Sequence, residues 1–255
     1  MDRATSVKVV IAKRNRLEHT LNCLRFLDYA NEHKYFDVNV CVCDDTYSEF
    51  LTNDYSFANL SVTKIHLKNE GAFNKSQLLN EGIKNSTSGT FDYMMIVDCD
   101  MIYSPTTFSV VNNLISQGYD YVVCHGWKLG EGTQNLVNSA NSFDDVYKLP
   151  KEEFNVGPSQ VSISNKGYQI IQQYFPGKLY REEFAGWGGE DSVLSSVSRK
   201  LALDGKLRKT EVSNVWLHQY HEFNGNHPLY KSNLQLFKQI DAMIMHKNLE
   251  DRCQR

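Results

Sequence analysis

Two aspartates stand one residue apart directly after an apolar run. The run is Tyr93 to Val97, and the acids are Asp98 and Asp100. Such a run is typical of a strand buried on both faces, and ligands of open α/β sheets lie beyond the carboxyl ends of the strands. Two carboxylates this close repel each other unless a cation or hydrogen-bond donors compensate, and Mg²⁺ and Mn²⁺ take oxygen ligands. The pair is therefore either a metal site that also meets phosphates or a solvated strand end.

A second group of reactive residues closes a glycine-rich loop. The segment 186–191 reads GWGGED and leads into a predicted helix from Ser192 to Leu201. Its glycines allow the backbone to approach a ligand closely, and the indole of Trp187 offers a flat apolar wall. Glu190 and Asp191 either cap the helix, where its dipole favours acids, or face a sugar. The tryptophan among glycines favours the sugar-facing site.

Basic residues follow the first predicted strand. Arg14 and Arg16 lie between this strand and a helix with leucines at helical spacing. They are either solvated surface charges or an anion site, to which a helix N-terminus adds its own positive end. The second predicted strand ends in Asp44 and Asp45. An acid at this point can accept hydrogen bonds from a nucleoside, as in dinucleotide-binding folds, although no GxGxxG precedes it here.

Two histidines follow the last apolar strand. His218 comes directly after the segment 215–217, and His221 follows three residues later. A single histidine is usually structural, but these two could complete a coordination sphere that an acid begins. The contribution of His221 stays open at this point.

Strand and helix patterns alternate along the chain. An α/β protein with a mostly parallel sheet and right-handed crossovers is the fold class that this alternation predicts. The segment from Gly126 to Pro150 loses periodicity, and we expect an excursion or a short antiparallel hairpin beside the site. The predicted strands are 7–12, 38–43, 62–67, 93–97, 119–124, 161–163 and 215–217. The predicted helices are 17–31, 76–84, 106–117, 165–174, 192–201 and 229–247, the last with Leu234, Leu236, Phe237, Ile240 and Ile244 available for packing.

The composition of the 255 residues is that of a soluble globular protein, with 41% hydrophobic residues, 22% charged residues and a net charge of -3. No basic block indicates a nucleic-acid partner. No apolar run approaches the roughly 20 residues that span a bilayer, and the start from Met1 to Ser6 lacks a signal-peptide core. We therefore expect a cytoplasmic protein without a transmembrane segment. The six cysteines show no CxxC spacing, which favours small buried side chains over disulfides or zinc ligands.

Taken together, these motifs resemble the nucleotide-sugar glycosyltransferases with the GT-A (Rossmann-like) fold. The resemblance is greatest to the branch of β-1,4-galactosyltransferases and bacterial chondroitin-polymerase transferase domains, and it covers Val9 to about Gln219. Residues 14–16 look like the RNR turn of that branch, 73–75 with 78–80 like its FNRxxLLN segment, 98–100 like its DxD, and 186–191 like its GWGGED. The chain departs from the branch at Ala12 and Lys13, where a proline is replaced, and 155–159 aligns only loosely with a region that influences donor choice.

The resemblance assigns a role to each matching position. It implies that UDP contacts come from four residues, namely Arg14, Arg16, Phe73 and Lys75. Asp44 would meet the nucleoside, Asp98 the donor, and Asp100 with His218 a Mn²⁺ or Mg²⁺ ion. The donor and acceptor sugars would lie against Trp187, Gly188 and Gly189. Glu190 would bond a sugar hydroxyl and Asp191 would be the catalytic base.

The activity expected from this resemblance is inverting transfer of a hexose from a UDP-sugar to a hydroxyl of a glycan acceptor. Galactose or N-acetylgalactosamine is the preferred sugar, ahead of glucose and its N-acetyl derivative. We expect one domain, with a nucleotide-binding half (1–125), an acceptor-binding and metal-completing half (126–228) and a C-terminal helix (229–255). The resemblance is also compatible with this chain being one part of a larger multi-domain glycosyltransferase. The alternatives are a sugar nucleotidyltransferase, which would need a glycine-rich triphosphate loop near the first strand, and a catalytically silent carbohydrate-binding domain.

Overall fold

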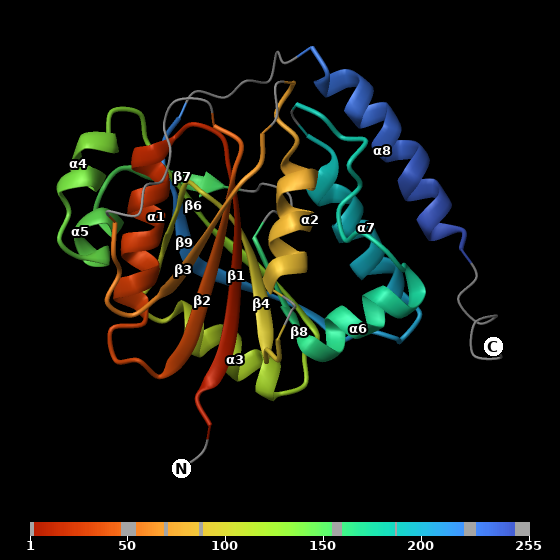
Figure 1. The fold of residues 1–255 in the computed structure, drawn as a ribbon, viewed down its shortest axis with the longest axis horizontal. Helices are drawn as coiled ribbons and strands as arrows, with labels where there is room; N and C mark the ends of the chain where they lie inside the picture. The colour runs from red at the N-terminus through yellow and green to blue at the C-terminus, as the bar shows by residue number, and fades with distance from the viewer. Residues whose placement is uncertain are drawn as a thin grey trace.

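Nine strands in the described residues form one sheet, and helices pack on both of its faces (Figure 1). The structure is a computed structural model that describes residues 3–46, 55–68, 71–86, 89–154, 160–186, 188–221 and 228–247. The strands are β1 (Thr5–Lys13), β2 (Phe36–Asp44), β3 (Ser61–His66), β4 (Tyr93–Asp98), β5 (Met101–Tyr103), β6 (Tyr121–Leu129), β7 (Lys151–Phe154), β8 (Val161–Ser164) and β9 (Lys209–His218). Their order across the sheet is β3-β2-β1-β4-β8-β6-β9-β5, and β7 pairs with β6.

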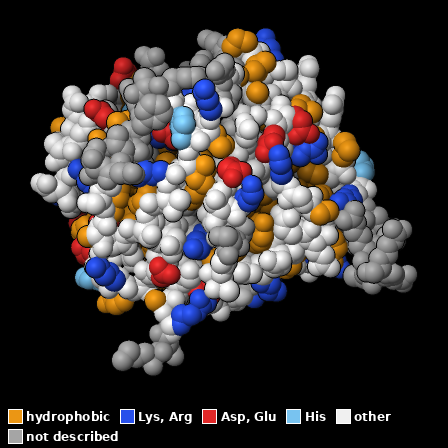
Figure 2. Space-filling view, in the orientation of Figure 1, with side chains coloured by type: hydrophobic (Ala, Val, Ile, Leu, Met, Phe, Trp, Pro, Cys, Tyr) orange, Lys and Arg blue, Asp and Glu red, His pale blue; other side chains and the backbone are white. Residues whose placement is uncertain are grey.

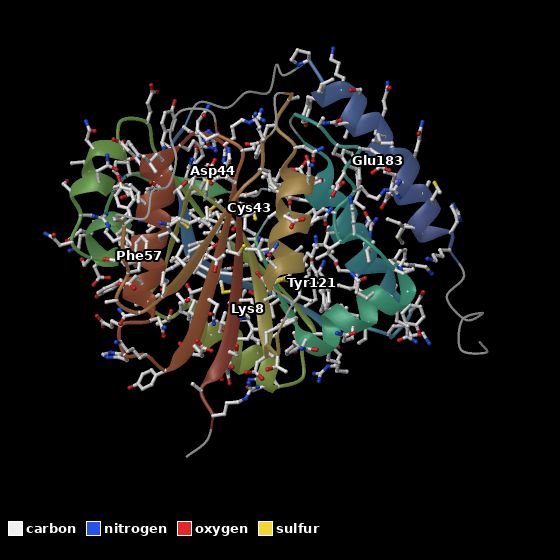
Figure 3. The ribbon with its side chains drawn as sticks, viewed as in Figure 1. Lys8, Cys43, Asp44, Phe57, Tyr121 and Glu183 are labelled. Atoms are coloured by element: carbon white, nitrogen blue, oxygen red, sulfur yellow. The ribbon has the colours of Figure 1, made fainter. Side chains whose placement is uncertain are left out.

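The directions of the strands confirm the predicted mostly parallel sheet. β1 is parallel to both of its neighbours, β2 and β4, and β3 is parallel to β2. β8 lies antiparallel between β4 and β6, so β6 and its parallel partner β9 point the same way as β4. The antiparallel members are β8, β5 and β7. The carboxyl ends of β1, β2, β4, β6 and β9 therefore meet at one edge, where Figure 3 shows Asp44 at the end of β2.

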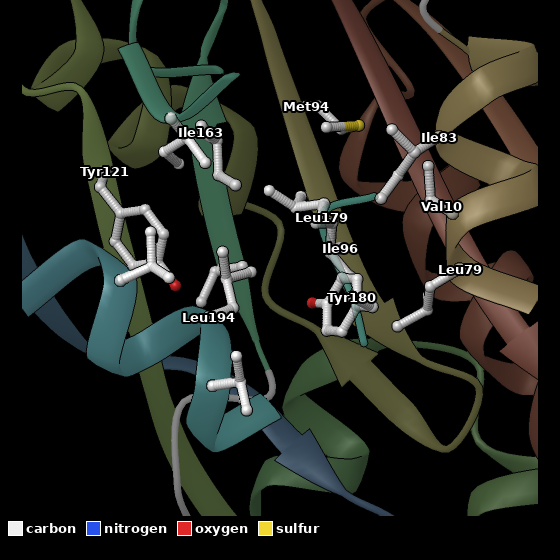
Figure 4. Packing of buried hydrophobic residues seen from close by; sticks show 14 of the residues in the cluster. Val10, Leu79, Ile83, Met94, Ile96, Tyr121, Ile163, Leu179, Tyr180 and Leu194 are labelled. Atoms are coloured by element: carbon white, nitrogen blue, oxygen red, sulfur yellow. The ribbon is translucent and has the colours of Figure 1, made fainter. Parts of the chain in front are cut away.

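Each central strand is buried on both faces. In β1, Val9 and Ile11 face the layer formed by α1 (Leu17–Ala30) and α3 (Thr107–Ser116). Val10 faces the opposite layer, which contains α2 (Lys75–Ser86), α6 (Asn165–Tyr174) and α7 (Glu190–Leu203). Figure 4 shows this second layer, in which Leu79 and Ile83 of α2 approach the sheet. Strands that are buried on both faces have continuous apolar runs in the sequence, such as 93–97.

Three further helices within the described residues lie outside these two layers. α8 (Tyr230–Met245) packs on α7 at the right of Figure 1, with Ile240 and Ile244 buried. Leu234 is 41% exposed, so its expected part in packing was wrong. α4 (Gln134–Ser139) and α5 (Phe143–Tyr147) form the excursion at the left. The segment predicted to lack periodicity therefore contains the end of β6 and two short helices before β7 returns antiparallel.

The surface and the cysteines match a globular protein. Cys23, Cys41, Cys43, Cys99 and Cys124 are buried free thiols, as predicted, and Cys253 lies outside the described residues. Figure 2 shows acidic and basic side chains close together near α2 and α7, where ion pairs such as Arg181 with Glu183 occur. Among the described residues, none of the helices has the length and apolar character needed to cross a membrane.

Candidate active site

The first of two charged clusters joins the turn after β4 to the end of β9. β5 pairs antiparallel with β9, with Met101 opposite His218, which brings Asp100 beside a residue far along the chain. The backbone oxygen of Asp100 also accepts a hydrogen bond of 2.9 Å from the Gln219 amide. Asp100 Oδ1 lies 3.7 Å from His218 Nε2, and its Oδ2 lies 3.2 Å from His221 Nε2. We call Asp100, His218 and His221 the aspartate–histidine cluster.

This cluster has the donor set of a metal site. One ligand atom from each of the three residues lies within 4.8 Å of the other two. Asp100 Oδ1 is buried and accepts no hydrogen bond from the described residues. Burial lowers the pKa of His218, which favours the neutral imidazole that metal binding requires. Two imidazoles and a carboxylate suit a transition ion such as Mn²⁺ better than Mg²⁺, which prefers oxygen ligands. His221, left open by the sequence, belongs to this set.

Arg16 also reaches the Asp100 carboxylate. Its Nη1 lies 2.5 Å from Asp100 Oδ2, and its Nη2 lies 3.2 Å from His221 Nδ1. Arg16 and Asn15 have φ of 54° and 56°, and two successive non-glycine residues in the left-handed region are uncommon outside functional sites. Burial raises the pKa of Asp100, but His218, His221 and Arg16 outweigh it and hold the pKa well below its usual range. The carboxylate is therefore ionised and ready to bind a cation.

The second cluster surrounds a lysine at the start of α2. Lys75 Nζ lies 2.6 Å from Asp98 Oδ1, 2.8 Å from Asp191 Oδ2 and 3.7 Å from Glu190 Oε1. We call Lys75, Asp98, Glu190 and Asp191 the lysine cluster. Asp98 comes from the end of β4, whereas both other acids occupy the first turn of α7. Because only Cys99 separates Asp98 from Asp100, the two clusters are neighbours at the same edge of the sheet.

Asp191 has the most unusual carboxyl in the lysine cluster. Burial, together with the nearby charges of Glu190 and Asp98, overcomes the opposing effect of Lys75 and raises the pKa of Asp191 to about 7. Its Oδ1 is buried and accepts no hydrogen bond from the described residues. A carboxyl that titrates near neutral pH is suited to act as a general base, since it gains and loses a proton readily there.

Asp98 is oriented by a residue that the sequence did not point to. The Gln160 amide donates to Asp98 Oδ2 at 2.8 Å, and Gln160 Oε1 accepts from the Asp98 backbone at 3.1 Å and from the Tyr103 hydroxyl at 2.8 Å. Gln160 is buried just before β8. A single glutamine beside a predicted strand carries no recognisable pattern, so only the three-dimensional structure reveals this contact.

The glycine-rich loop needs its glycines. Gly188 and Gly189 have φ of 89° and 101°, a region that other residues rarely adopt. A Cβ atom on Gly189 would lie 2.5 Å from the ring of Phe184, and one on Gly188 would lie 3.0 Å from the ring of Tyr230. The loop therefore turns sharply into α7 and presents both acids of its first turn to Lys75. Trp187, the predicted wall for the sugars, lies outside the described residues.

Arg14 and Phe73 lie together, as shared UDP contacts would. The Arg14 guanidinium carbon lies 5.5 Å from the centre of the Phe73 ring. Two guanidinium nitrogens of Arg14 donate to Asp45 at 2.9 and 2.6 Å, and a third donates to the Gly71 carbonyl at 3.0 Å. The bidentate pair with the buried Asp45 fixes the plane of the guanidinium over the ring. The sequence places Asp45 among the acids at the end of the second strand but does not predict its pair with Arg14.

Asp44 is held by Lys13, the last residue of β1. The ammonium of Lys13, which is fully buried, lies 2.9 Å from Asp44 Oδ2 and also donates to the Thr46 hydroxyl at 2.9 Å. The Thr46 amide donates to Asp44 Oδ1 at 2.8 Å. Both carboxylate oxygens of Asp44 therefore have partners within the protein, so the prediction that Asp44 meets a nucleoside stays a prediction.

Solved structures resemble the chain over almost its whole length. Staphylococcus aureus TarS matches with a TM-score of 0.62 at 15% identity, over 97% of this chain, and the chain spans 41% of that TarS structure. The chain spans 68% of TarS 1–349 in complex with UDP-GlcNAc, at 16% identity and a TM-score of 0.62. A Drosophila β-1,4-galactosyltransferase 7 variant in complex with manganese, UDP-galactose and xylobiose matches at 14% identity with a TM-score of 0.52, over 96% of this chain and 82% of its own.

These neighbours decide the fold. The chain has the GT-A glycosyltransferase fold. No protein-family model matches it, and a search against curated proteins returns no match. In this fold the carboxyl ends of β1, β2 and β4, the aspartate–histidine cluster and the lysine cluster lie at one edge of the sheet, and the chemistry of these residues follows from their own geometry.

Proposed function

We propose that this protein is a metal-dependent inverting glycosyltransferase that moves a hexose from a UDP-sugar to a hydroxyl group of a glycan acceptor. One observation carries the proposal: a metal-type cluster and a carboxyl with a pKa of about 7 lie side by side, linked through Asp98 and Asp100. The UDP-sugar and manganese complexes of the GT-A neighbours support the same classes of donor and ion.

The donor side of the reaction uses residues around the ends of β1 and β4. Asp100, His218 and His221 would hold the ion, which when bound supplies positive charge that stabilises the departing diphosphate. Arg14, Arg16 and Phe73 would contact UDP, and Asp44 its nucleoside. Asp98, held in place by Gln160, faces the donor sugar. Trp187, Gly188 and Gly189 are proposed to border the sugars.

The acceptor side uses the first turn of α7. Asp191 takes the proton from the acceptor hydroxyl as the hydroxyl oxygen attacks the anomeric carbon, and the bond to the UDP oxygen breaks on the opposite side. This single displacement inverts the configuration of the sugar. Glu190 is proposed to bond a sugar hydroxyl, and holding both substrates in line supplies much of the acceleration.

The proposal extends to the donor sugar and the arrangement of the chain. Galactose or N-acetylgalactosamine is the proposed sugar, with a nucleotide-binding half (1–125), an acceptor-binding and metal-completing half (126–228) and a C-terminal helix (229–255). Because the chain spans 41% of the longer TarS structure, a place within a larger glycosyltransferase is also proposed.

A panel of UDP-sugars, each with and without Mn²⁺, tests the proposal in two measurements. Protection against thermal unfolding reports binding, and slow release of UDP reports turnover. We expect the best protection and the fastest release with UDP-galactose or UDP-N-acetylgalactosamine in the presence of Mn²⁺. Binding without UDP release from any donor would contradict the proposal and favour a silent carbohydrate-binding domain.

A further inference from the structure

The ammonium of Lys75 is shared by three carboxylates. Asp98 and Asp191 lie at hydrogen-bond distance, 2.6 and 2.8 Å, and Glu190 lies at 3.7 Å. An ammonium has three N–H donors on a single nitrogen, so it can serve partners that arrive from different directions. Here the partners come from β4 and from the first turn of α7, two elements far apart in sequence.

The cluster is partly buried. The side chain of Lys75 is 12% exposed, that of Glu190 13%, that of Asp191 18% and that of Asp98 23%. Burial disfavours the charged form of Lys75, but Asp191, Asp98 and Glu190 outweigh burial and raise its pKa well above the usual value. Lys75 therefore remains a cation, and one positive charge lies among three acids.

The groups that face Asp191 show what the ammonium does. Glu190 and Asp98 are acidic. The buried phenols of Tyr121, in β6, and Tyr180, in the segment before the glycine-rich loop, also lie near Asp191, whose charge helps to raise their pKa values. Figure 4 shows both phenols within the layer beside Leu194 of α7. Lys75 is the cation among the described groups that act on Asp191. If its charge were removed, two acids and a buried setting would favour a protonated Asp191.

We propose that Lys75 is a positioning residue for the transfer reaction, which favours the ionised form of Asp191 and ties it to Asp98, so that the base lies beside the donor side of the site. This inference rests on the proposed function, in which Asp191 is the base. It gives Lys75 a role beyond the UDP contact implied by resemblance: the ammonium acts through Asp191 and need not touch the diphosphate.

The residue type supports this role. An ammonium is a compact point charge, whereas a guanidinium is a planar fork suited to one bidentate partner. At a position with three carboxylate partners on two elements, Lys75→Arg retains the charge but not the contact geometry, and Lys75→Met removes the charge while keeping most of the side-chain volume.

Carbon-13 NMR of protein labelled at the aspartate carboxyls measures the inference directly. The signal of Asp191 is assigned by its disappearance in Asp191→Asn and is then followed against pH in wild type and variants. We expect a midpoint near 7 in wild type, as the structure indicates. In Lys75→Met the midpoint should rise by at least about one unit, which corresponds to a tenfold change in the ionisation equilibrium. Lys75→Arg should leave it within about half a unit.

Lys84→Met is the matched control, because Lys84 lies at the other end of α2 with its side chain 77% exposed. It should leave the midpoint unchanged. If Lys75→Met does not fold, Lys75→Gln repeats the test with a neutral side chain that can still donate hydrogen bonds. An unchanged midpoint in the folded neutral variant would overturn the inference.

Kinetics separate this inference from the proposed function. If transfer is observed, the acid limb of the kcat/KM profile should move upward in Lys75→Met together with the NMR midpoint, while UDP affinity changes little. A moved midpoint with no UDP release from any donor in the wild type would reject the proposed function alone, since Lys75 would still control Asp191. Transfer that requires Asp191, with an unmoved midpoint, would reject only the role of Lys75.

Discussion

Asp100 is buried and Asp191 is partly buried at the same edge of the sheet, and their surroundings push the pKa values of the two carboxyls in opposite directions. Burial raises the pKa of each. Around Asp100, His218, His221 and Arg16 more than compensate, and its pKa falls well below the usual range. Around Asp191, Lys75 is opposed by Glu190 and Asp98, and the pKa rises to about 7. Burial alone does not decide the state of an acid, because the balance of neighbouring charges does.

The difference in pKa suits the two carboxyls to different roles. A carboxylate that stays ionised at all ordinary pH values is a suitable cation ligand, and one that titrates near neutrality is a suitable proton acceptor. Titratable pairs whose environments separate their pKa values are a general sign of assigned acid and base roles. Asp98 contacts Lys75 and lies two positions before Asp100 in the sequence. It therefore connects the lysine cluster with the aspartate–histidine cluster.

The strongest test of the comparison removes the titrating carboxyl. Asp191→Asn should lower the rate of transfer by about a thousandfold or more, because the acceptor hydroxyl loses its base. Binding of UDP and Mn²⁺, measured by calorimetry, should remain close to wild type, since Asp191 is not part of the aspartate–histidine cluster. Asp204→Asn at the other end of α7 is the control and should transfer at the wild-type rate. Full activity in Asp191→Asn would mean that the base is another group.

The next largest effect concerns the other half of the comparison. His221→Ala and His218→Ala should each weaken Mn²⁺ binding by at least about 10-fold to 100-fold, since even residues that only support metal ligands contribute this much. His19→Ala is the control: its Nε2 lies 3.2 Å from the Tyr220 carbonyl, and it is not in the cluster. Paramagnetic resonance of free Mn²⁺ in the absence of nucleotide measures the affinity. Equal losses in all three variants would indicate a general disturbance of the segment after β9.

The pH dependence of the two halves should differ in the same way. The value of kcat/KM should fall about tenfold for each pH unit below about 7, because protonated Asp191 cannot accept a proton. Asp100 keeps its charge over this range, because its neighbours hold its pKa well below the usual value. The Asp100 carboxylate should therefore add nothing to the pH dependence of Mn²⁺ affinity over the first unit below neutrality. Carbon-13 NMR of the Asp100 carboxyl should show no titration in this range, and a titration that follows that of Asp191 would show that the two carboxyls do not behave independently.

The same residues show which parts of the site can be predicted from the sequence. The apolar run before Asp98 predicts the strand end to within one residue, and the loop before Glu190 predicts the helix start to within two, because both patterns are local. The meeting of Lys75 with Asp191 could not be predicted from spacing, since it depends on how α2 and α7 pack on one face of the sheet. The place of His221 depends on the pairing of β5 with β9, and a short strand such as β5 has too few residues for a pattern.

Polar contacts inside the core were the hardest to foresee. Gln160 and Lys13 are buried polar residues whose partners, Asp98 and Asp44, come from other strands. Nothing in a single sequence distinguishes such residues from surface ones, because burial of a polar group depends on the partner that satisfies it. Lys13 lies in the segment where the chain departs from the branch that it resembles, and its ion pair with Asp44 explains how a buried lysine is accommodated there.

The smallest expected effect probes the cation on the Asp100 side. Arg16 Nη1 lies 2.5 Å from the same oxygen that faces His221, so a bound metal ion and the guanidinium compete for one carboxylate. Arg16→Gln should therefore tighten Mn²⁺ binding without nucleotide by about threefold to tenfold, a modest gain because the Arg16 side chain is 29% exposed and water screens its charge. Arg14→Gln, which loses the pair with Asp45 instead, should leave the affinity unchanged. Weaker Mn²⁺ binding in Arg16→Gln would mean that Arg16 orients Asp100 for the metal ion, and the two carboxyls would then be alike in needing a basic partner to set them in place.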